Sequence, residues 1–324
     1  MLIDLLLFGL GLAALMWSAD RFVFGAAAIA NNYGIPPLVI GLTIVAMGSS
    51  APEVMISATA ALEGQVDTAV GNAIGSNITN MALVLGAAAL LRPLAVSSNL
   101  ISRELPILLA ATALVGYLLN DLLLGLTEAM LLFGVFIVTM AYLVFATLRQ
   151  SKQQPDPMES EVDAEIPHDV STAKALLWIA IGGVVLAYSS DVLVESASNI
   201  ARYFGMSDLL IGLTIIAIGT SLPELAASIA GVLKNEDDMV LGNIIGSNMF
   251  NMLFVLSIPG FLAPSEIDPF AAGRDYYVMA GLTAVLFLMA MGFGKQRRIN
   301  RWEGALLMAC FVGYQYLLFT TSFS

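Results

Sequence analysis

Two apolar segments of this sequence each carry a glutamate directly after a proline. The segment GLTIVAMGSSAPEVMIS contains Pro52 and Glu53, and the segment GLTIIAIGTSLPELAAS contains Pro223 and Glu224. An ionisable side chain at bilayer depth costs about 2.5–3.5 kcal/mol on insertion scales, so its default interpretation is a functional site. Because proline removes a backbone donor and clashes with the carbonyl four residues back, we predict a break in the helix beside each glutamate. Backbone groups freed at that depth are tolerated only if they are buried in protein or line a cavity.

Oxygen-bearing groups surround both glutamates in the sequence. Hydroxyl residues precede each one, and the motifs GNAIGSNITN and GNIIGSNMFN follow, each with a serine and an asparagine four residues apart on one helix face. The break at each proline adds free carbonyls near two alanines. The predicted ligands in the first half are Ala46, Ser49, Ser50, Glu53, Ser76 and Asn80, and those in the second half are Ala217, Thr220, Ser221, Glu224, Ser247 and Asn251.

This set of ligands suits a hard cation. Calcium takes about 6–8 oxygen ligands at about 2.3–2.6 Å, and two glutamates carry a charge that matches one Ca²⁺; the same oxygens could hold several Na⁺. The single histidine, His168, and the single cysteine, Cys310, leave no site for a soft metal, and we expect no cofactor. A membrane proline, serine or GxxxG pair taken singly is usually structural, but their joint repetition favours an ion site.

Other repeated acids receive a different interpretation. Asp20 and Asp191, in WSAD and YSSD, are favoured as packing or gating residues rather than ion ligands. Glu128 and Glu303 open two apolar segments. We expect both to lie at helix N-termini, where the helix dipole favours an acid.

The composition places these motifs in membrane-spanning helices. The 324-residue chain is 58% hydrophobic and only 12% charged, with a mean hydropathy of +0.86, whereas soluble domains carry about 25% charged residues. The net charge of −12 argues against binding nucleic acid or anionic lipid.

Apolar stretches of roughly 20 residues cross a bilayer as helices. They occupy 3–29, 37–61, 68–90, 104–119, 125–148, 175–200, 208–232, 239–261, 275–293 and 303–321, which predicts an all-α integral membrane protein with ten transmembrane helices.

A shift of 171 residues aligns one half of the chain with the other. It takes Glu53 to Glu224 and GNAIGSN at 71–77 to GNIIGSN at 242–248, and it needs no gap from residue 20 to residue 103. Each half holds five predicted spans, and because five is odd the halves must cross the membrane in opposite directions, as in the inverted repeats of secondary transporters. We therefore expect a first repeat over 1–148, a linker over 149–173 and a second, inverted repeat over 174–324.

Lysine and arginine gather in one set of alternate loops, which orients the chain by the positive-inside rule. Arg149, Lys174 and Lys295 belong to the basic set, whereas Arg202 and Arg274 fall in the other loops. We expect both termini outside and the linker in the cytoplasm, in a bacterial or archaeal plasma membrane. The linker is acidic and contains prolines, so flexibility is its favoured interpretation, and it lacks the D-x-D-x-D-G spacing of a calcium loop.

The paired motifs resemble a known family. GSSAPE and GTSLPE, each followed by GNxIGSN, resemble the two alpha-repeats of the calcium/cation antiporter superfamily, which includes the sodium/calcium exchangers. The resemblance extends over essentially the whole chain and is strongest to the short bacterial members of the YrbG type. It implies two inverted five-helix repeats, ion sites lined by the ligand positions named above, and first and sixth spans that slide across the rest. One departure is Asn251, where several relatives carry an acid.

The resemblance also implies an activity. The expected protein is a secondary active antiporter and not an enzyme, exchanging Na⁺ for Ca²⁺ by alternating access at Glu53 and Glu224. A Ca²⁺/H⁺ or broader cation/proton exchanger is the alternative, since a carboxylate can take up a proton, and K⁺ is a further candidate ion; a cation channel is a more distant alternative. Membrane lipid surrounds such a protein, and no residue pattern indicates an obligate protein partner.

Overall fold

The computed structural model describes residues 2–34, 48–98, 100–151, 170–234, 237–292 and 297–322, and most of them are helical. Helices are labelled α, strands β, and π-helical or 3-10 segments η. The first half contains α1 (Leu2–Asn32), α4 (Ala51–Leu62), α5 (Val66–Thr79), η2 (Asn80–Val84), α6 (Leu85–Leu91), β1 (Leu94–Ala95), η3 (Leu100–Glu104), α7 (Leu105–Leu118), η4 (Leu119–Asp121), β2 (Leu123–Leu124) and α8 (Leu126–Ser151). The second half contains α10 (Thr172–Phe204), α11 (Asp208–Ile211), η5 (Gly212–Ile216), α12 (Ala217–Thr220), α13 (Leu222–Lys234), α14 (Asp237–Phe250), η6 (Asn251–Val255), α15 (Ser257–Leu262), β3 (Ser265–Glu266), η7 (Ala271–Asp275), α16 (Tyr276–Met291), β4 (Arg298–Ile299) and α17 (Arg301–Ser322).

The predicted all-α membrane fold is confirmed. Within the described ranges, nine helices are long and apolar enough to cross a membrane, and they lie over nine of the predicted spans. The remaining span, predicted over 37–61, is described only from residue 48 onward, and α4 forms its second part. Residues 152–169 of the predicted linker lie outside the described residues; α8 continues to Ser151 and α10 begins at Thr172.

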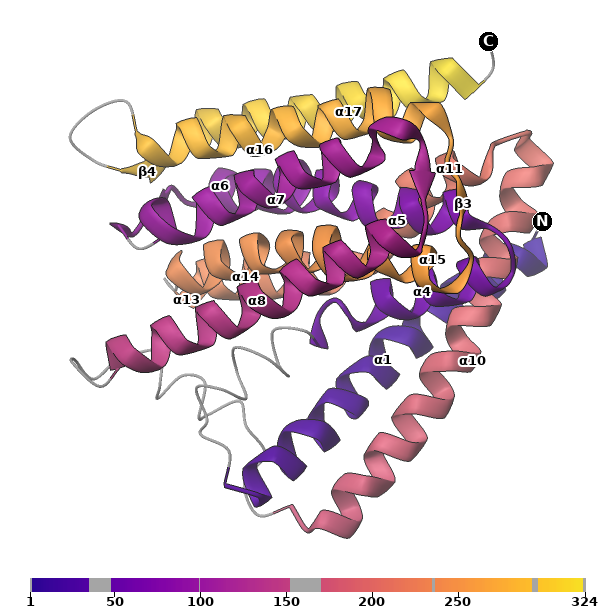
Figure 1. Cartoon of the computed structure of the whole chain (residues 1–324), viewed down its shortest axis with the longest axis horizontal. Coiled ribbons are helices and arrows are strands. Elements are labelled where there is room, and N and C mark those ends of the chain that lie inside the picture. Colours follow the sequence, from indigo (N-terminus) through magenta and orange to yellow (C-terminus); the bar gives the residue numbers. More distant parts are fainter. Residues whose placement is uncertain are drawn as a thin grey trace.

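The two halves run in opposite directions through the molecule. Asn32, at the end of α1, donates to the Val170 carbonyl just before α10 (2.9 Å), and Asn199, near the end of α10, donates to Asp4 near the start of α1 (3.4 Å). The helices that open the two halves are therefore antiparallel neighbours, as an inverted repeat requires. In Figure 1, α1 and α10 lie side by side, apart from the stack that contains α6, α7, α16 and α17.

Two short strand pairs repeat the same symmetry. Leu94 of β1 pairs with Ile299 of β4, and Leu124 of β2 pairs with Ser265 of β3, both antiparallel. The shift of 171 takes Leu94 to Ser265, and a shift of 175 takes Leu124 to Ile299, so each pair is the image of the other. The second half therefore contains four more residues than the first between its two strands. We did not predict these strands, which are too short to show a periodic pattern.

π-helical segments begin at matching positions of the two halves. η2 begins at Asn80 and η6 at Asn251, and in each the backbone N–H five residues later bonds to the asparagine carbonyl. η3 and η7 also begin at equivalent positions, because the shift of 171 takes Leu100 to Ala271. An extra residue in a helical turn re-aims the side chains around it and is common at functional sites, so the predicted ligands Asn80 and Asn251 sit at points of local rearrangement.

Most of the described basic residues gather at one end of the molecule. Both chain ends lie at one end of the molecule in Figure 1, while β4 and the starts of α14 and α17 lie at the other. At that second end Arg92 pairs with Asp237, and Arg301 donates to the Leu91 carbonyl (3.1 Å). We call this the basic end, and its described basic residues include Arg92, Arg103, Arg149, Lys174, Arg297, Arg298 and Arg301. Acidic residues occur at both ends. Asp237 and Glu104 pair with Arg92 and Arg103 at the basic end, while Asp4, Glu63, Asp67, Asp121, Asp208, Glu266 and Asp268 lie toward the opposite end.

Glycines let the two halves meet closely beside the glutamate segments. A Cβ on Gly71 of α5 would lie 2.6 Å from the Leu209 carbonyl oxygen, and one on Gly75 would lie 2.8 Å from the Leu213 Cα. The GxxxG pair of the first half therefore packs closely against α11 and η5, as small residues in membrane helices commonly do. By the repeat, the second pair would face residues within 35–47, which lie outside the described residues.

Replacing Gly71 with alanine tests this contact. The new methyl group would press on backbone atoms, which cannot rotate away, so we expect Gly71→Ala to lower the free energy of unfolding by about 1–3 kcal/mol. Gly313→Ala is the matched control, because Gly313 is an exposed helical glycine with no described atom within 4 Å of a Cβ. Thermal unfolding in detergent measures both, and an equal effect of the two substitutions would contradict the close packing.

Candidate cation-binding site

Each glutamate lies in the first turn of a helix that restarts after a break. Glu53 follows Pro52 at the beginning of α4, and Glu224 lies in the first turn of α13. The residue before each helix leaves the helical conformation in the same way, with φ −91° and ψ 9° at Ser50 and φ −84° and ψ 4° at Ser221. The predicted breaks are confirmed. Because the free N–H groups of a first helical turn favour negative charge, each break stabilises the carboxylate beside it.

The structure buries the predicted ligand positions together. Glu53 and Glu224 are both 0% exposed. Ser49 is half-buried, and Ala46 lies outside the described residues. The other predicted positions are all buried, namely Ser50, Ser76, Asn80, Ala217, Thr220, Ser221, Ser247 and Asn251.

The two halves contribute to one site rather than to two. The carboxylates of Glu53 and Glu224 are close enough to repel each other. The Thr220 hydroxyl, from the second half, interacts with Glu53, while the Ser49 hydroxyl, from the first half, interacts with Glu224. Each carboxylate therefore has neighbours from the opposite repeat. A ligand between the glutamates would contact both halves at once.

Many of these oxygens have no hydrogen bond of normal geometry within the described part of the chain. They belong to Ser50, Glu53, Asn80, Ser221, Glu224, Ser247 and Asn251. An unsatisfied buried polar group costs about 1–3 kcal/mol, and more when it is charged. Buried carboxylate, hydroxyl and amide oxygens that lack hydrogen-bond partners are suited to a hard cation, which takes such oxygens as ligands.

Asn72 is a residue of this site that the sequence interpretation missed. Its Nδ2 donates to the Glu53 carbonyl (3.1 Å) and to the Ser57 hydroxyl (3.0 Å), and its Oδ1 accepts from the Thr220 hydroxyl at 3.4 Å. Thr220 Oγ1 also lies 3.4 Å from Ser76 Oγ. Asn72 thus joins α4, α5 and α12 behind the carboxylates. Its signal was the first asparagine of GNAIGSN, which the repeat places again at Asn243.

The last asparagine of each GNxIGSN motif, Asn77 or Asn248, is buried as well. Asn77 Nδ2 lies 3.4 Å from the Met279 sulfur of α16. It therefore faces the packing between α5 and α16. Two further contacts of this kind are related by the repeat, with Thr283 beside Met81 (3.4 Å) and Thr112 beside Met252 (3.5 Å).

The other repeated acids lie outside this site. Asp20 is exposed and pairs with Arg21 (3.3 Å). Asp191 and Glu195 lie near Glu63, at the end of α4; partial burial, followed by the negative charge of these two neighbours, raises the pKa of Glu63. Asp20 on α1 and Asp191 on α10 thus lie away from the buried glutamates, and their role in packing or gating stays a prediction.

Glu128 and Glu303 act as predicted at helix starts. Glu128 accepts a hydrogen bond from the Gly125 N–H (3.0 Å), and Glu303 accepts one from the Asn300 N–H (2.6 Å). These contacts are equivalent under the shift of 175 residues. They satisfy backbone donors that a helix N-terminus otherwise leaves free.

The contacts of Asn72 predict that its replacement destabilises the protein more than replacement of its repeat partner, Asn243. Asn72→Ala removes the side-chain donor to the Glu53 carbonyl and to the Ser57 hydroxyl, so we expect a loss of about 1–3 kcal/mol in unfolding free energy. Asn243→Ala is the matched control, because within the described residues Asn243 Nδ2 has no hydrogen-bond partner. Thermal unfolding of the two variants in detergent should show the larger decrease for Asn72→Ala; the reverse order would contradict the assignment.

The fold and the site together define a class of protein. Inverted helical repeats, discontinuous helices and buried acids where the repeats meet characterise secondary transporters. The family model described as "Sodium/calcium exchanger protein" matches residues 3–145 and 174–320. This chain belongs to that family, whose members are cation antiporters and not enzymes.

Individual relatives agree with this membership. The chain is 57% identical to CaxA from Alkalimonas amylolytica over 314 residues, which cover 96% of this chain and 97% of CaxA. It is 41% identical to the inner membrane protein YrbG of Escherichia coli over 322 residues, or 99% of this chain and 98% of YrbG. Among solved structures, the sodium-calcium exchanger NCX_Mj matches with a TM-score of 0.63 and 29% identity, over 96% of this chain and 97% of that one.

Proposed function

We propose that this protein exchanges Na⁺ for Ca²⁺ across the membrane, with the ions competing for a site built on Glu53 and Glu224. The observation that carries this proposal is the pair of fully buried carboxylates, close to each other and surrounded by hydroxyl and amide oxygens. Their combined charge matches one Ca²⁺, and their environment offers hard oxygen ligands only. The likeness to NCX_Mj, a sodium-calcium exchanger, supports the same pair of ions.

The proposed coupling follows from the electrostatics of the site. Two like charges held close together in a medium of low dielectric are strongly unfavourable without a cation. A site that empties of Ca²⁺ should therefore refill with Na⁺ before it changes its exposure. Such a requirement makes the protein an exchanger rather than a channel, since a channel needs no counter-ion.

The proposed moving part is the pair of helices α1 and α10. They pack as one body: a Cβ on Gly182 would lie 2.7 Å from the Phe22 N atom, and one on Gly11 would lie 3.5 Å from the Leu193 Cβ, two contacts related by the repeat. Polar contacts between this body and the rest include Thr59 with Ser190 (2.9 Å) and Ser198 with Gln65 (2.8 Å). Sliding of the pair along α4 would open the site to one side at a time.

We also propose that the basic end faces the cytoplasm and that both termini lie outside. The positive-inside rule supports this orientation, because the lysines and arginines gather at the end opposite to the termini. The proposed site contains two acids, Glu53 and Glu224. Asn251 contributes an amide at a position where several relatives have a carboxylate.

Transport by purified protein in liposomes tests the choice of counter-ion. Liposomes loaded with Na⁺ and diluted into Na⁺-free buffer should accumulate ⁴⁵Ca²⁺, because outward Na⁺ movement drives Ca²⁺ inward. Collapsing the Na⁺ gradient with an ionophore should abolish the uptake. Uptake that is independent of the Na⁺ gradient but depends on an imposed pH gradient would rule out Na⁺ coupling and favour Ca²⁺/H⁺ exchange.

Substitution of the two acids tests the site itself. Glu53→Gln and Glu224→Gln each remove half of the negative charge while keeping side-chain size, so we expect ⁴⁵Ca²⁺ uptake to fall to the level of protein-free liposomes. Glu266→Gln is the control, since Glu266 is an exposed acid of β3. If both buried variants fold and still transport, the ion site must lie elsewhere.

A further inference from the structure

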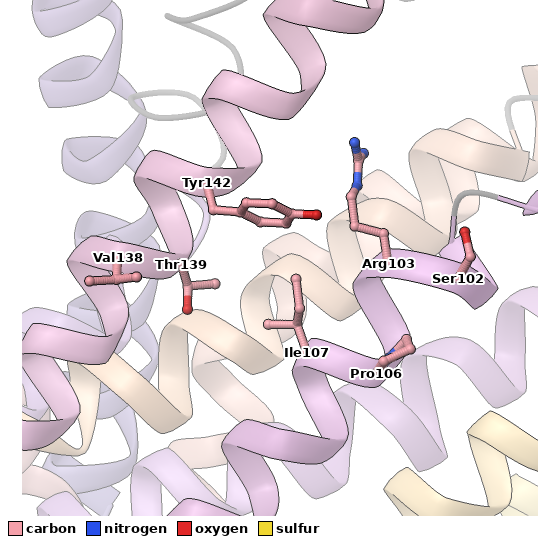
Figure 2. Close-up of a pocket in the computed structure, with 7 residues that line it drawn as sticks. All are labelled: Ser102, Arg103, Pro106, Ile107, Val138, Thr139 and Tyr142. Carbon is pink, nitrogen blue, oxygen red and sulfur yellow. The ribbon is translucent and has the colours of Figure 1, made fainter.

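A pocket opens on the side of the molecule between α8 and the start of α7. Its volume is about 370 Å³, and it is lined by Ser102, Arg103, Pro106, Ile107, Val138, Thr139 and Tyr142. Figure 2 shows the Tyr142 hydroxyl pointing across the gap toward η3, on which Arg103 and Ser102 lie, with Ile107 on the near part of α7. The pocket combines a cation and hydroxyls with apolar walls. It is separate from the buried glutamates.

The internal repeat explains why the pocket exists. The shift of 171 takes Arg103 to Arg274, and the shift of 175 takes Thr139 to Tyr314. In the second half the Tyr314 ring is buried, and its hydroxyl donates to Asp275 Oδ1 at 2.9 Å. Threonine is much smaller than tyrosine, so in the first half the corresponding space is left open beside Arg103.

The two arginines are also engaged differently. Arg274 binds both carboxylate oxygens of Asp275 (2.7 and 3.0 Å), donates to Thr321 (3.0 Å) and stacks on the Phe270 ring at 4.9 Å. Within the described residues, Arg103 makes one ion pair, from Nη2 to Glu104 at 3.2 Å, and its buried Nε has no hydrogen-bond partner. The guanidinium of Arg103 therefore keeps donors for a ligand that Arg274 has already used within the protein.

The position of the pocket indicates the kind of ligand. The outer face of α8 beside it is apolar and exposed, with Val138 at 70%, Tyr142 at 51% and Phe145 at 64% exposure. In a membrane protein such a face contacts lipid chains, and Arg103 stands at the basic end, near the level of the headgroups. Arginine binds phosphate through a planar fork of donors, and basic pockets between membrane helices accept anionic headgroups.

We propose that this pocket binds an anionic glycerophospholipid, with its phosphate on Arg103 and the Tyr142 hydroxyl and one acyl chain along Ile107 and Val138. The net charge of −12 argues against a general attraction of the whole chain to anionic lipid. The proposed binding therefore depends on the local donors of the pocket, the Arg103 guanidinium and the Tyr142 hydroxyl. The site is independent of the proposed ion exchange.

Native mass spectrometry of the detergent-purified protein tests the proposal. Dioleoylphosphatidylglycerol should be retained more strongly than dioleoylphosphatidylcholine. Loss of the charged donor in Arg103→Gln should reduce its retention about tenfold. Thr139→Tyr should reduce it similarly, because the new ring fills the pocket as Tyr314 does in the second half. Lys174→Gln, a basic residue of the same end that does not line the pocket, should leave retention unchanged.

The outcomes distinguish the sources of phosphate. Equal retention of the two lipids, or retention that survives both pocket variants, would overturn the proposal. Thermal unfolding with millimolar inorganic phosphate provides the second arm. A stabilisation by phosphate alone that disappears in Arg103→Gln would assign the pocket to a soluble phosphate and reject the lipid, whereas stabilisation by phosphatidylglycerol only would support it.

Discussion

Two carboxylates buried close together repel each other, and the helix breaks, the inverted repeat and the surrounding oxygens of this protein can all be understood as compensation for that repulsion. Glu53 and Glu224 are fully buried and close to each other, and such charges are stable only if dipoles and a cation compensate them. The two helix starts at α4 and α13 supply fixed dipoles. In the proposed site, hydroxyl and amide oxygens would complete the ligand set of a hard cation, whose charge would neutralise the two carboxylates.

The inverted repeat supplies the geometry that this compensation requires. One segment provides one helix N-terminus, which approaches the centre of the membrane from one side. Two N-termini that face each other therefore require two copies of the segment that run in opposite directions. The antiparallel pair α1 and α10 and the two repeat-related strand pairs follow this arrangement in the described part of the chain. Gly71 and Gly75 then let the two copies approach closely enough to share ligands.

Departures from the repeat are as informative as its matches. Asn72 bonds to the Glu53 backbone and connects to Thr220, whereas Asn243 Nδ2 has no partner within the described residues. The two halves of the site are thus in different local states, which is the kind of asymmetry that an alternating mechanism uses. A second departure is the pair Thr139 and Tyr314. The Tyr314 ring fills its space in the second half, whereas the smaller Thr139 leaves a pocket in the first half.

Several features could be predicted from the sequence alone, namely the membrane class, the inverted repeat, the breaks beside both glutamates and the helix starts at Glu128 and Glu303. These features depend on composition, on the spacing of repeated motifs and on local backbone chemistry, all of which can be read along the chain. Contacts between the halves could not be read from the sequence. The folded structure places predicted ligands of each half beside the glutamate of the other and places Asn72 behind Glu53. It also begins π-helical turns at Asn80 and Asn251 and leaves a pocket beside Arg103. The physical reason is that such contacts join residues far apart in sequence, where small differences in side-chain volume and hydrogen bonding decide which neighbours meet.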